Sequence, residues 1–445
     1  MKKRLFTILT ISLLFFIFGC GDKKSQTNDS GNSGVNSETD DDGNSGNDKN
    51  NKNKGDSTDT EDIGNSGETD DSGNSGNTEV DNNIQIDDPE VFVSVWKIKA
   101  YHSVILPLVE LGTYDFTVKW GDGTENYITT WDDPNLSHEY DSDGDYVVQI
   151  KGVISGWQFC AKKDQSEYDL SLDCNASTDK IVDIKQWGTL SFGDTHAQFA
   201  SCNELNITAE DAPDLSETKT LELAFYGNNN LKGNSSFPKW DVSNITNMRH
   251  MFSGVISFNA DIGNWDVSNV TDMESMFRGA RNFNKDITKW DVSKATTLNS
   301  MFSGANNFNQ DIGLWDVSNV TNTGGMFSGA RSFNQDISCW DVSNVTYMHA
   351  MFEGAINFNQ DIGNWSVSRV GDMGRMFKDA RAFNQDIGKW NVSGTSNMKN
   401  MFENAKAFNQ DLSNWCVRYI HEKPEDFDTD ANAWVLPRPV WGTCP

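Results

Sequence analysis

The sequence is short of basic residues. It has 36 lysines and arginines against 65 aspartates and glutamates, a formal net charge of −29 over 445 residues. Binding to DNA or RNA depends on basic side chains that displace counterions from phosphates. Because no basic stripe of that kind runs through the sequence, we expect no nucleic-acid partner. The length allows two or three domains.

Metal-ligand and catalytic motifs are also missing. No CxxC, CxxH or HExxH spacing occurs, and the six histidines are scattered. No glycine loop of the phosphate-cradling type follows a strand pattern, and no nucleophile, base and orienting residue converge in the sequence. We therefore expect a protein that is not an enzyme and that has no metal site and no cofactor.

Long apolar runs are absent after the N-terminus. Residues 1–19 read as a secretory signal peptide, with a basic start followed by an apolar run. The tetrapeptide IFGC at 17–20 resembles a bacterial lipobox, in which Cys20 becomes the lipid-modified first residue of the mature protein. The resemblance implies a membrane-anchored lipoprotein at the cell surface, in the outer membrane or the cell envelope. Ordinary cleavage and secretion is the alternative.

Residues 20–88 lack the apolar side chains that a core needs. They are nearly all Asp, Glu, Asn, Ser, Gly, Thr and Lys, and the tetrapeptide GNSG recurs. Such a composition cannot offset the entropy lost on ordering, so we expect a disordered acidic linker that serves as a stalk. An acidic cation-binding segment is the alternative.

Residues 89–179 show the alternation of β-strands. Tyr114, Phe116 and Val118 alternate with polar residues, and no convincing helical period occurs in the segment. This pattern predicts an all-β, immunoglobulin-like sandwich.

A motif in the same segment points to a family. The sequence WGDGT at 120–124, followed by His138, Tyr140 and GDYVVQI at 144–150, resembles a PKD-type domain. In that family the corresponding histidine is structural. The resemblance therefore implies a structural role for His138.

A tryptophan recurs every 25 residues in the C-terminal half. The series is Trp240, Trp265, Trp290, Trp315, Trp340, Trp365, Trp390 and Trp415. Each unit reads approximately WDVSNVTxMxxMFxGAxxFNQDIGx, and a period of this size is typical of a solenoid. We expect coils of a short strand plus a short helix or 3-10 turn, about 4.8 Å apart. The regular repeats span 240–415, with irregular repeats at 180–239 and a C-terminal cap at 416–445.

The repeat and the preceding IVDIKQWG at 181–188 resemble the leucine-rich repeats of BspA-type bacterial surface lipoproteins. Phe and Trp stand where most such repeats have Leu, which leaves the shape of the coil open. The resemblance implies an exported, anchored protein that attaches to host matrix proteins, host cells or other bacteria.

Export would place the cysteines in an oxidising compartment, where disulfides persist. The candidate pairs are Cys160 with Cys174 and Cys416 with Cys444, although sequence alone leaves the connectivity open. Cys202 falls where later repeats have Ala280, so we expect it in the core. We interpret Cys339 as a free thiol.

Stacking turns each repeat position into a column of side chains. We expect the tryptophan column to form core rather than a carbohydrate platform. The asparagine column, predicted to be a buried ladder that satisfies backbone groups, is Asn259, Asn284, Asn309, Asn334, Asn359, Asn384 and Asn409. The aspartate column is Asp261, Asp286, Asp311, Asp336, Asp361, Asp386 and Asp411. Its carboxylates should accept hydrogen bonds from turn amides, with calcium as the alternative.

Two columns vary in chemistry, and we expect both to face solvent. One supplies the candidate ligand face, Arg281, Arg331, Arg381 and Lys406. The other precedes the MF pair and runs from His250 through Ser275 to Asn400. We expect a monomer whose repeats offer a binding face to an extracellular or host-surface protein. A glycan-binding module that uses exposed tryptophan and a structural coat component are the alternatives.

Overall fold

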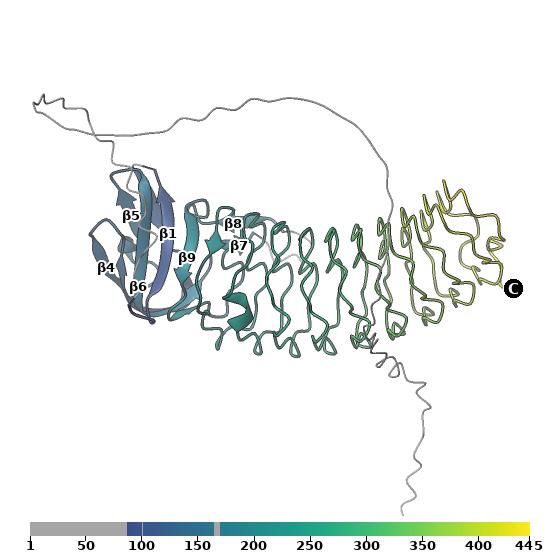
Figure 1. The fold of residues 1–445 in the computed structure, drawn as a ribbon, viewed down its shortest axis with the longest axis horizontal. Helices are drawn as coiled ribbons and strands as arrows, with labels where there is room; N and C mark the ends of the chain where they lie inside the picture. The colour runs from purple at the N-terminus through teal and green to yellow at the C-terminus, as the bar shows by residue number, and fades with distance from the viewer. Residues whose placement is uncertain (1–86, 100, 164–169) are drawn as a thin grey trace, which may run out of the picture. The chain divides into compact units, whose positions relative to one another are not determined.

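The computed structural model describes residues 87–99, 101–163 and 170–445. The predicted signal peptide, Cys20 and nearly all of the predicted linker lie outside these residues. The described chain is mostly β up to residue 207 and consists mainly of turns after it (Figure 1). Its elements are β1 (Phe92–Ile98), β2 (His102–Ile105), β3 (Leu108–Lys119), β4 (Glu125–Ile128), η1 (Pro134–Leu136), β5 (Ser137–Tyr140), β6 (Gly144–Trp157), β7 (Cys160–Lys162), β8 (Leu172–Cys174), β9 (Ile181–Gln186), β10 (Leu190–Ser191), β11 (Asn206–Ile207) and η2 (Phe237–Lys239). No helix among the described residues is long and apolar enough to cross a membrane.

Seven strands form the main sheet of the described region. Its order is β11-β9-β1-β6-β3-β4, and β10 pairs with β6. β6 runs antiparallel to both β1 and β3, with Phe116 opposite Gly152. β2 pairs with β5 and β7 with β8 in two further two-stranded sheets.

The alternation seen in the sequence sets the two faces of β3. Phe116 and Val118 are buried, whereas Asp115 is exposed, because successive side chains point to opposite faces of a strand. The ring of Trp120, which follows β3, is fully buried as well. The expectation of a mostly β region is confirmed.

The main sheet extends past the boundary that we placed at residue 179. β9 pairs antiparallel with β1, and β11 pairs parallel with β9. Trp187 packs near Phe92, with 6.5 Å between their ring centroids. The segment that we assigned to the first irregular repeats thus contributes strands to the sheet.

Successive repeats lie side by side and pair through their backbones (Figure 1). One position per repeat forms a parallel β-bridge with the next, in an unbroken series from Thr220 to Asn397. Beyond the bridge, alternate amides donate to the following coil. Examples are Ser275 N to Asn299 O (2.8 Å), Phe277 N to Met301 O (2.9 Å) and Gly279 N to Ser303 O (2.7 Å). An inserted residue would move every later donor off its acceptor, which accounts for the constant spacing.

The coils consist of turns and single bridges, where we expected a short strand plus a short helix or 3-10 turn. Between 240 and 415 the described chain forms no helix and no strand longer than a single bridge. Hydrogen bonds join Met276 N to Met273 O (3.2 Å) and Ala280 N to Phe277 O (3.0 Å), as in 3-10 turns. However, Ser275 (φ 55°) and Gly279 (φ 74°) adopt the left-handed conformation, which interrupts any right-handed helix. Of the two geometries that we expected, the short helix is wrong, and turns with 3-10-type hydrogen bonds are the ones that form.

Three columns of aromatic rings fill the coils. Phe277 stacks on Phe283 within its own coil at 4.0 Å between centroids and on Phe302 of the next at 5.7 Å. Trp290 and Trp315 stack at 6.4 Å with only 6° between their planes. Each coil buries its rings against its neighbours, so the core is continuous along the repeats.

The irregular repeats continue one of these columns. Phe199 stacks on Phe225 at 5.7 Å, and Phe225 stacks on Phe252 at the same distance. Cys202 is buried, as expected, and burial raises the pKa of its thiol.

The stacking changes after the last regular repeat. Phe427 and Trp434 meet Phe402 edge-on, with interplanar angles of 79° and 70°. The Trp434 indole donates to the backbone oxygen of Gln410 (2.9 Å). Edge-on rings cover the final stacked face with a different geometry from that of the repeats.

The structure forms both candidate disulfides, Cys160–Cys174 and Cys416–Cys444. The first joins β7 to β8. The interpretation of Cys339 as a free thiol is wrong, because it is disulfide-bonded in the structure. The residues at the same position of other repeats, such as Asn264, Lys289 and Leu314, could not indicate whether Cys339 forms a bond.

Candidate binding surfaces of the repeats

The tryptophan column lies inside the coils. Every ring from Trp240 to Trp415 is at most 4% exposed. From Trp265 to Trp415 each indole nitrogen donates to a backbone oxygen of the preceding coil, as from Trp290 to Ile262 (3.1 Å), whereas Trp240 donates to the hydroxyl of Ser236 (3.1 Å). The prediction that these rings form core is confirmed, and the column offers no surface to a sugar.

The aspartate column lies on the surface and forms turns. Each carboxylate accepts a hydrogen bond from the amide two residues later, as from Gly363 to Asp361 (2.9 Å) and from Ser413 to Asp411 (2.9 Å). Hydrogen bonds from the amide and hydroxyl of Thr288 lower the pKa of Asp286. Turn amides thus hold these side chains, as the sequence predicted. Among the described residues no group of three or more potential metal ligands clusters.

The asparagine column forms a ladder between coils. The side-chain oxygen of Asn284 accepts from the amide of Asn309 (2.9 Å), and the same bond recurs from Asn259 to Asn384. The prediction that this ladder satisfies backbone groups is confirmed. It is not buried, since its members are half-buried or exposed.

The candidate ligand face is exposed. Arg281, Arg331, Arg381 and Lys406 are all exposed and occupy the same position of four different coils. The remaining residues of the column between Ile256 and Lys406 are uncharged, so no carboxylate stands within it. Arg381 approaches Asp379 at 4.0 Å, and Lys406 donates to the backbone oxygen of Asp430 (3.1 Å). We call these four residues the basic edge.

The second variable column is not the solvent-facing one that we expected. His250 is 3% exposed and Ser275 is equally buried, while Arg375 is exposed. These residues share a left-handed backbone conformation, yet the side chains of the first coils are buried, so variation at this position does not indicate contact with solvent. That prediction is wrong for the first coils and for Ala350.

The positions beside the β-bridge form a further variable face that sequence reasoning missed. Arg249 binds Glu274 of the next coil (3.1 Å) and approaches Glu222 of the preceding one (4.0 Å). One coil of this face differs from the rest, because it carries both Tyr347 and His349, with 5.9 Å between their ring centroids. Tyr347 and His349 directly flank the buried Met348, and this alternation in the sequence could have indicated that both face outward.

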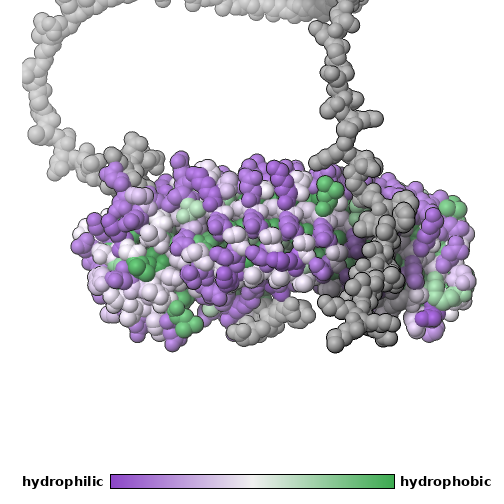
Figure 2. Space-filling view, turned by 90° about the horizontal axis from the view of Figure 1, so that it is seen from below, coloured by the Kyte–Doolittle hydropathy of each residue, from purple (hydrophilic) through white to green (hydrophobic). Residues whose placement is uncertain are grey.

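The hydropathy of the surface follows the columns. Figure 2 shows one face of the molecule, on which hydrophilic side chains lie in rows and hydrophobic ones are scattered. This arrangement is typical of a solvated face with polar contacts to offer.

Outside the repeats, His138 has the structural role that the PKD-type resemblance implied. Its Nε2 lies 2.7 Å from the carboxylate of Asp122, and its ring stacks on Trp120 at 4.7 Å. Asp122 also accepts from the amide of Thr124, which closes the WGDGT turn. These contacts engage the imidazole on its face and at its Nε2.

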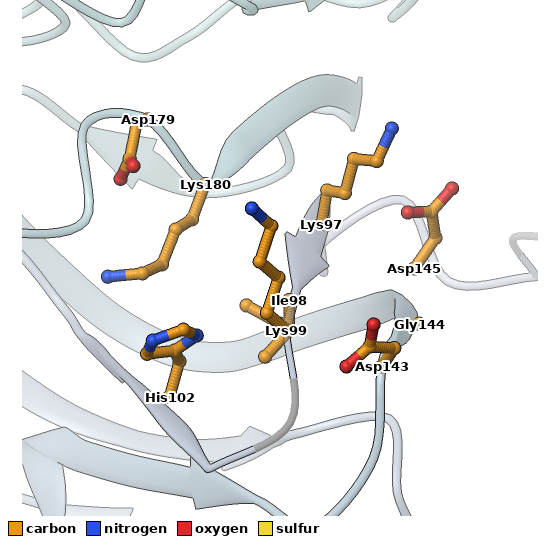
Figure 3. Close-up of a pocket in the computed structure, with 9 residues that line it drawn as sticks. All are labelled: Lys97, Ile98, Lys99, His102, Asp143, Gly144, Asp145, Asp179 and Lys180. Atoms are coloured by element: carbon orange, nitrogen blue, oxygen red, sulfur yellow. The ribbon is translucent and has the colours of Figure 1, made fainter.

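A pocket of about 530 Å³ lies where β1 ends and β6 begins (Figure 3). Lys97, Lys99 and Lys180 line it together with three aspartates and His102. In Figure 3 the amines of Lys97 and Lys99 point in different directions. The opposite charges balance, so the pocket does not favour an anion or a cation by charge alone.

Comparison with known protein families gives a match within the repeats. The family described as "Mycoplasma protein of unknown function, DUF285" matches residues 219–340 and 325–434. Together these two segments cover the region with the aromatic columns, so the chain is similar to this family there. No curated protein matches, and no solved structure does.

Proposed function

We propose that this protein is a lipid-anchored bacterial surface protein whose repeats form a leucine-rich-repeat-like solenoid that binds another protein along its basic edge. The lipobox-like IFGC at 17–20 supports export and anchoring at Cys20, which lies outside the described residues. The PKD-like sheet region serves as a spacer. The partner is an extracellular protein of the host matrix or host cell.

The basic edge is the observation that carries the proposal. In a chain of net charge −29, four cationic side chains share one exposed column that contains no carboxylate. Arg281, Arg331 and Arg381 lie at intervals of two coils, so their spacing is fixed by the stacking. A row of cations on a rigid scaffold fits an acidic stretch of a partner and accelerates its encounter.

The test replaces the edge and leaves the core intact. In the edge variant, Arg281, Arg331, Arg381 and Lys406 are all changed to serine. A matched control changes four cations of other columns, Lys289, Lys294, Arg369 and Lys389, to serine. Both variants have a net charge of −33, which is −29 less the four charges removed. Binding of the intact protein to plates coated with extracellular matrix is then measured at low and high salt.

We expect the edge variant to lose at least about tenfold in affinity, since each exposed pair contributes up to about 1 kcal/mol. The control should bind like the wild type, and salt should weaken wild-type binding. Equal losses in both variants would show that only net charge matters. If the wild-type protein binds no matrix protein, a role as a structural coat component is favoured.

A further inference from the structure

Trp131 differs from all other tryptophans of the chain. The chain has fifteen, all within the described residues, and Trp131 is the only exposed one, at 43%. It follows β4, outside the repeats. Exposing an indole costs hydrophobic free energy, so a bare tryptophan on a well-packed domain marks a contact surface.

The indole borders a pocket of about 300 Å³. The apolar lining comes from Leu108 and Val109 at the start of β3 and from Phe159 before β7. The polar lining consists of Glu110, Gln158, Asp173 and Asn175. An apolar surface with a few polar groups around it is the usual composition of a small-ligand site.

Two of the polar groups are held in place by the fold. Gln158 Nε2 donates to the backbone oxygen of Cys160 (2.7 Å). Asn175 Oδ1 accepts from the amide of Ser177 (2.9 Å), and its Nδ2 donates to Ile105 O (3.3 Å). These bonds restrict both amides, and so reduce the entropy that a ligand would have to remove.

The walls of the pocket are also fixed. Val109 N donates to Tyr114 Oη, and that hydroxyl contacts Gly156 O, both at 2.9 Å, which ties the start of β3 to the end of β6. The Cys160–Cys174 disulfide joins the two short strands that carry Ala161 and Asp173. The site is thus preorganised on β3, β7 and β8.

Two carboxylates remain available for a ligand. Glu110 and Asp173 are exposed, and neither makes a hydrogen bond or ion pair with a described side chain. Carboxylates are acceptors and prefer a ligand that is rich in hydroxyl donors. They also repel anions, so a sulfated or uronate-rich polymer does not fit.

We propose that the pocket around Trp131 binds a neutral saccharide. One sugar ring places its C–H face on the indole, and its hydroxyls donate to Glu110 and Asp173. This glycan site is independent of the basic edge, because it lies in the sheet region and uses no residue of the repeats. It retains the idea of a tryptophan platform but moves it from the buried column to the one exposed indole.

The experiment uses the intact chain and four hexasaccharide probes. Three are neutral, built of N-acetylglucosamine, glucose or mannose, and one is sulfated. Each is added at millimolar concentration, and acrylamide quenching of tryptophan fluorescence is measured together with binding by calorimetry. We expect at least one neutral hexasaccharide to bind and to reduce the quenching of the exposed fluorophore.

Three variants locate the site. Trp131→Ala should abolish both signals, and Trp131→Phe, which keeps an aromatic face, should retain binding weakened about tenfold. Changing Asp173→Asn should weaken binding without changing the quenching of the free protein. The edge variant described above should bind saccharide like the wild type, so failure of either proposal is recognised separately.

Three outcomes would overturn the proposal. They are no response to any neutral probe, equal binding by wild type and Trp131→Ala, and preference for the sulfated probe. Circular dichroism of Trp131→Phe checks that a loss of binding is not a loss of fold.

Discussion

The sheet region and the repeats stabilise their cores in different ways. In the sheet, Phe116 and Val118 of one strand meet residues far away in sequence, such as Gly152 and Ile150 on β6. In the repeats, Trp315 contacts Trp290 and Phe302, which both lie within the preceding 25 residues of the sequence. The contacts of the sheet are non-local and unique, while those of the repeats are local and copied.

This difference governs how damage spreads. A chain of units that contact only their neighbours responds to a substitution mainly in the adjacent coils. A sheet closed by long-range pairing loses its cooperative unit as a whole. The position of a substitution therefore predicts the extent of unfolding, not only its free energy.

The largest effect should come from deleting one ring in each region. Trp315→Ala removes two stacking contacts and an indole hydrogen bond to Ile287 O (3.3 Å), at a cost of about 3–5 kcal/mol. Trp120→Ala in the sheet should cost a similar amount. Hydrogen exchange should increase in the coils around 315 for the first variant and throughout β1, β3 and β6 for the second. Identical exchange patterns would contradict the contrast between the regions.

Acid should weaken the repeats at one position. Burial, reinforced by Arg249 and Arg278, lowers the pKa of His250 to about 3 in the folded chain, while the unfolded value is about 6.5. Between these values the unfolded state binds the proton more tightly, so stability falls as pH drops from about 6.5 towards 3. At pH 5 the loss is about 2 kcal/mol.

His250→Ser provides the matched control for this pH effect, because Ser275 occupies the same left-handed position of the next coil. Its denaturation midpoint should change less between pH 7 and 5 than that of the wild type. If the denaturation midpoints of the two proteins change equally with pH, His250 is not the cause of the acid sensitivity.

Asn228 should be a weak point that can be repaired. It is fully buried, and neither polar atom of its amide has a hydrogen-bond partner in the described structure. It holds the position where a regular coil has Ala280. Asn228→Ala should therefore stabilise the chain by about 1–2 kcal/mol, since an unpaired buried amide is expensive. Urea denaturation measures the gain, and a loss would show that the amide has a role in the irregular coils.

The spacing of the tryptophans predicted how the coils align and which rings they bury, because a constant period leaves one register for stacking. The same spacing could not show that the backbone of each coil forms a series of turns rather than a short helix. The stripe of Val270, Met273 and Met276 fits either geometry, and the sign of φ at Ser275 does not appear in an apolar pattern. The glycine at 279 was the clue that the helical reading ignored.

The candidate surface was predicted in part. The exposed positions of Arg281 and Arg331 followed from their variability, but the same reasoning failed at His250, where variation reflected a tolerant buried turn. The pairing of β9 with β1 could not be predicted either, because the local sequence IVDIKQ does not indicate which strand it pairs with. Non-local pairing is what a single sequence reveals least.

The smallest effect should come from the left-handed glycine column, and it tests whether the coils depend on local conformation. Gly329 has φ of 70°, and an added Cβ would meet only Gly304, at 3.6 Å or more, so the cost is conformational rather than steric. Gly329→Ala should destabilise the repeats by about 1 kcal/mol. Gly329→Asn should cost less, because Asp379 (φ 57°) and Asn404 (φ 58°) take the same position in later coils and such side chains tolerate this conformation. Equal losses for the two variants, measured by urea denaturation, would mean that crowding between coils rather than backbone conformation sets the preference for glycine.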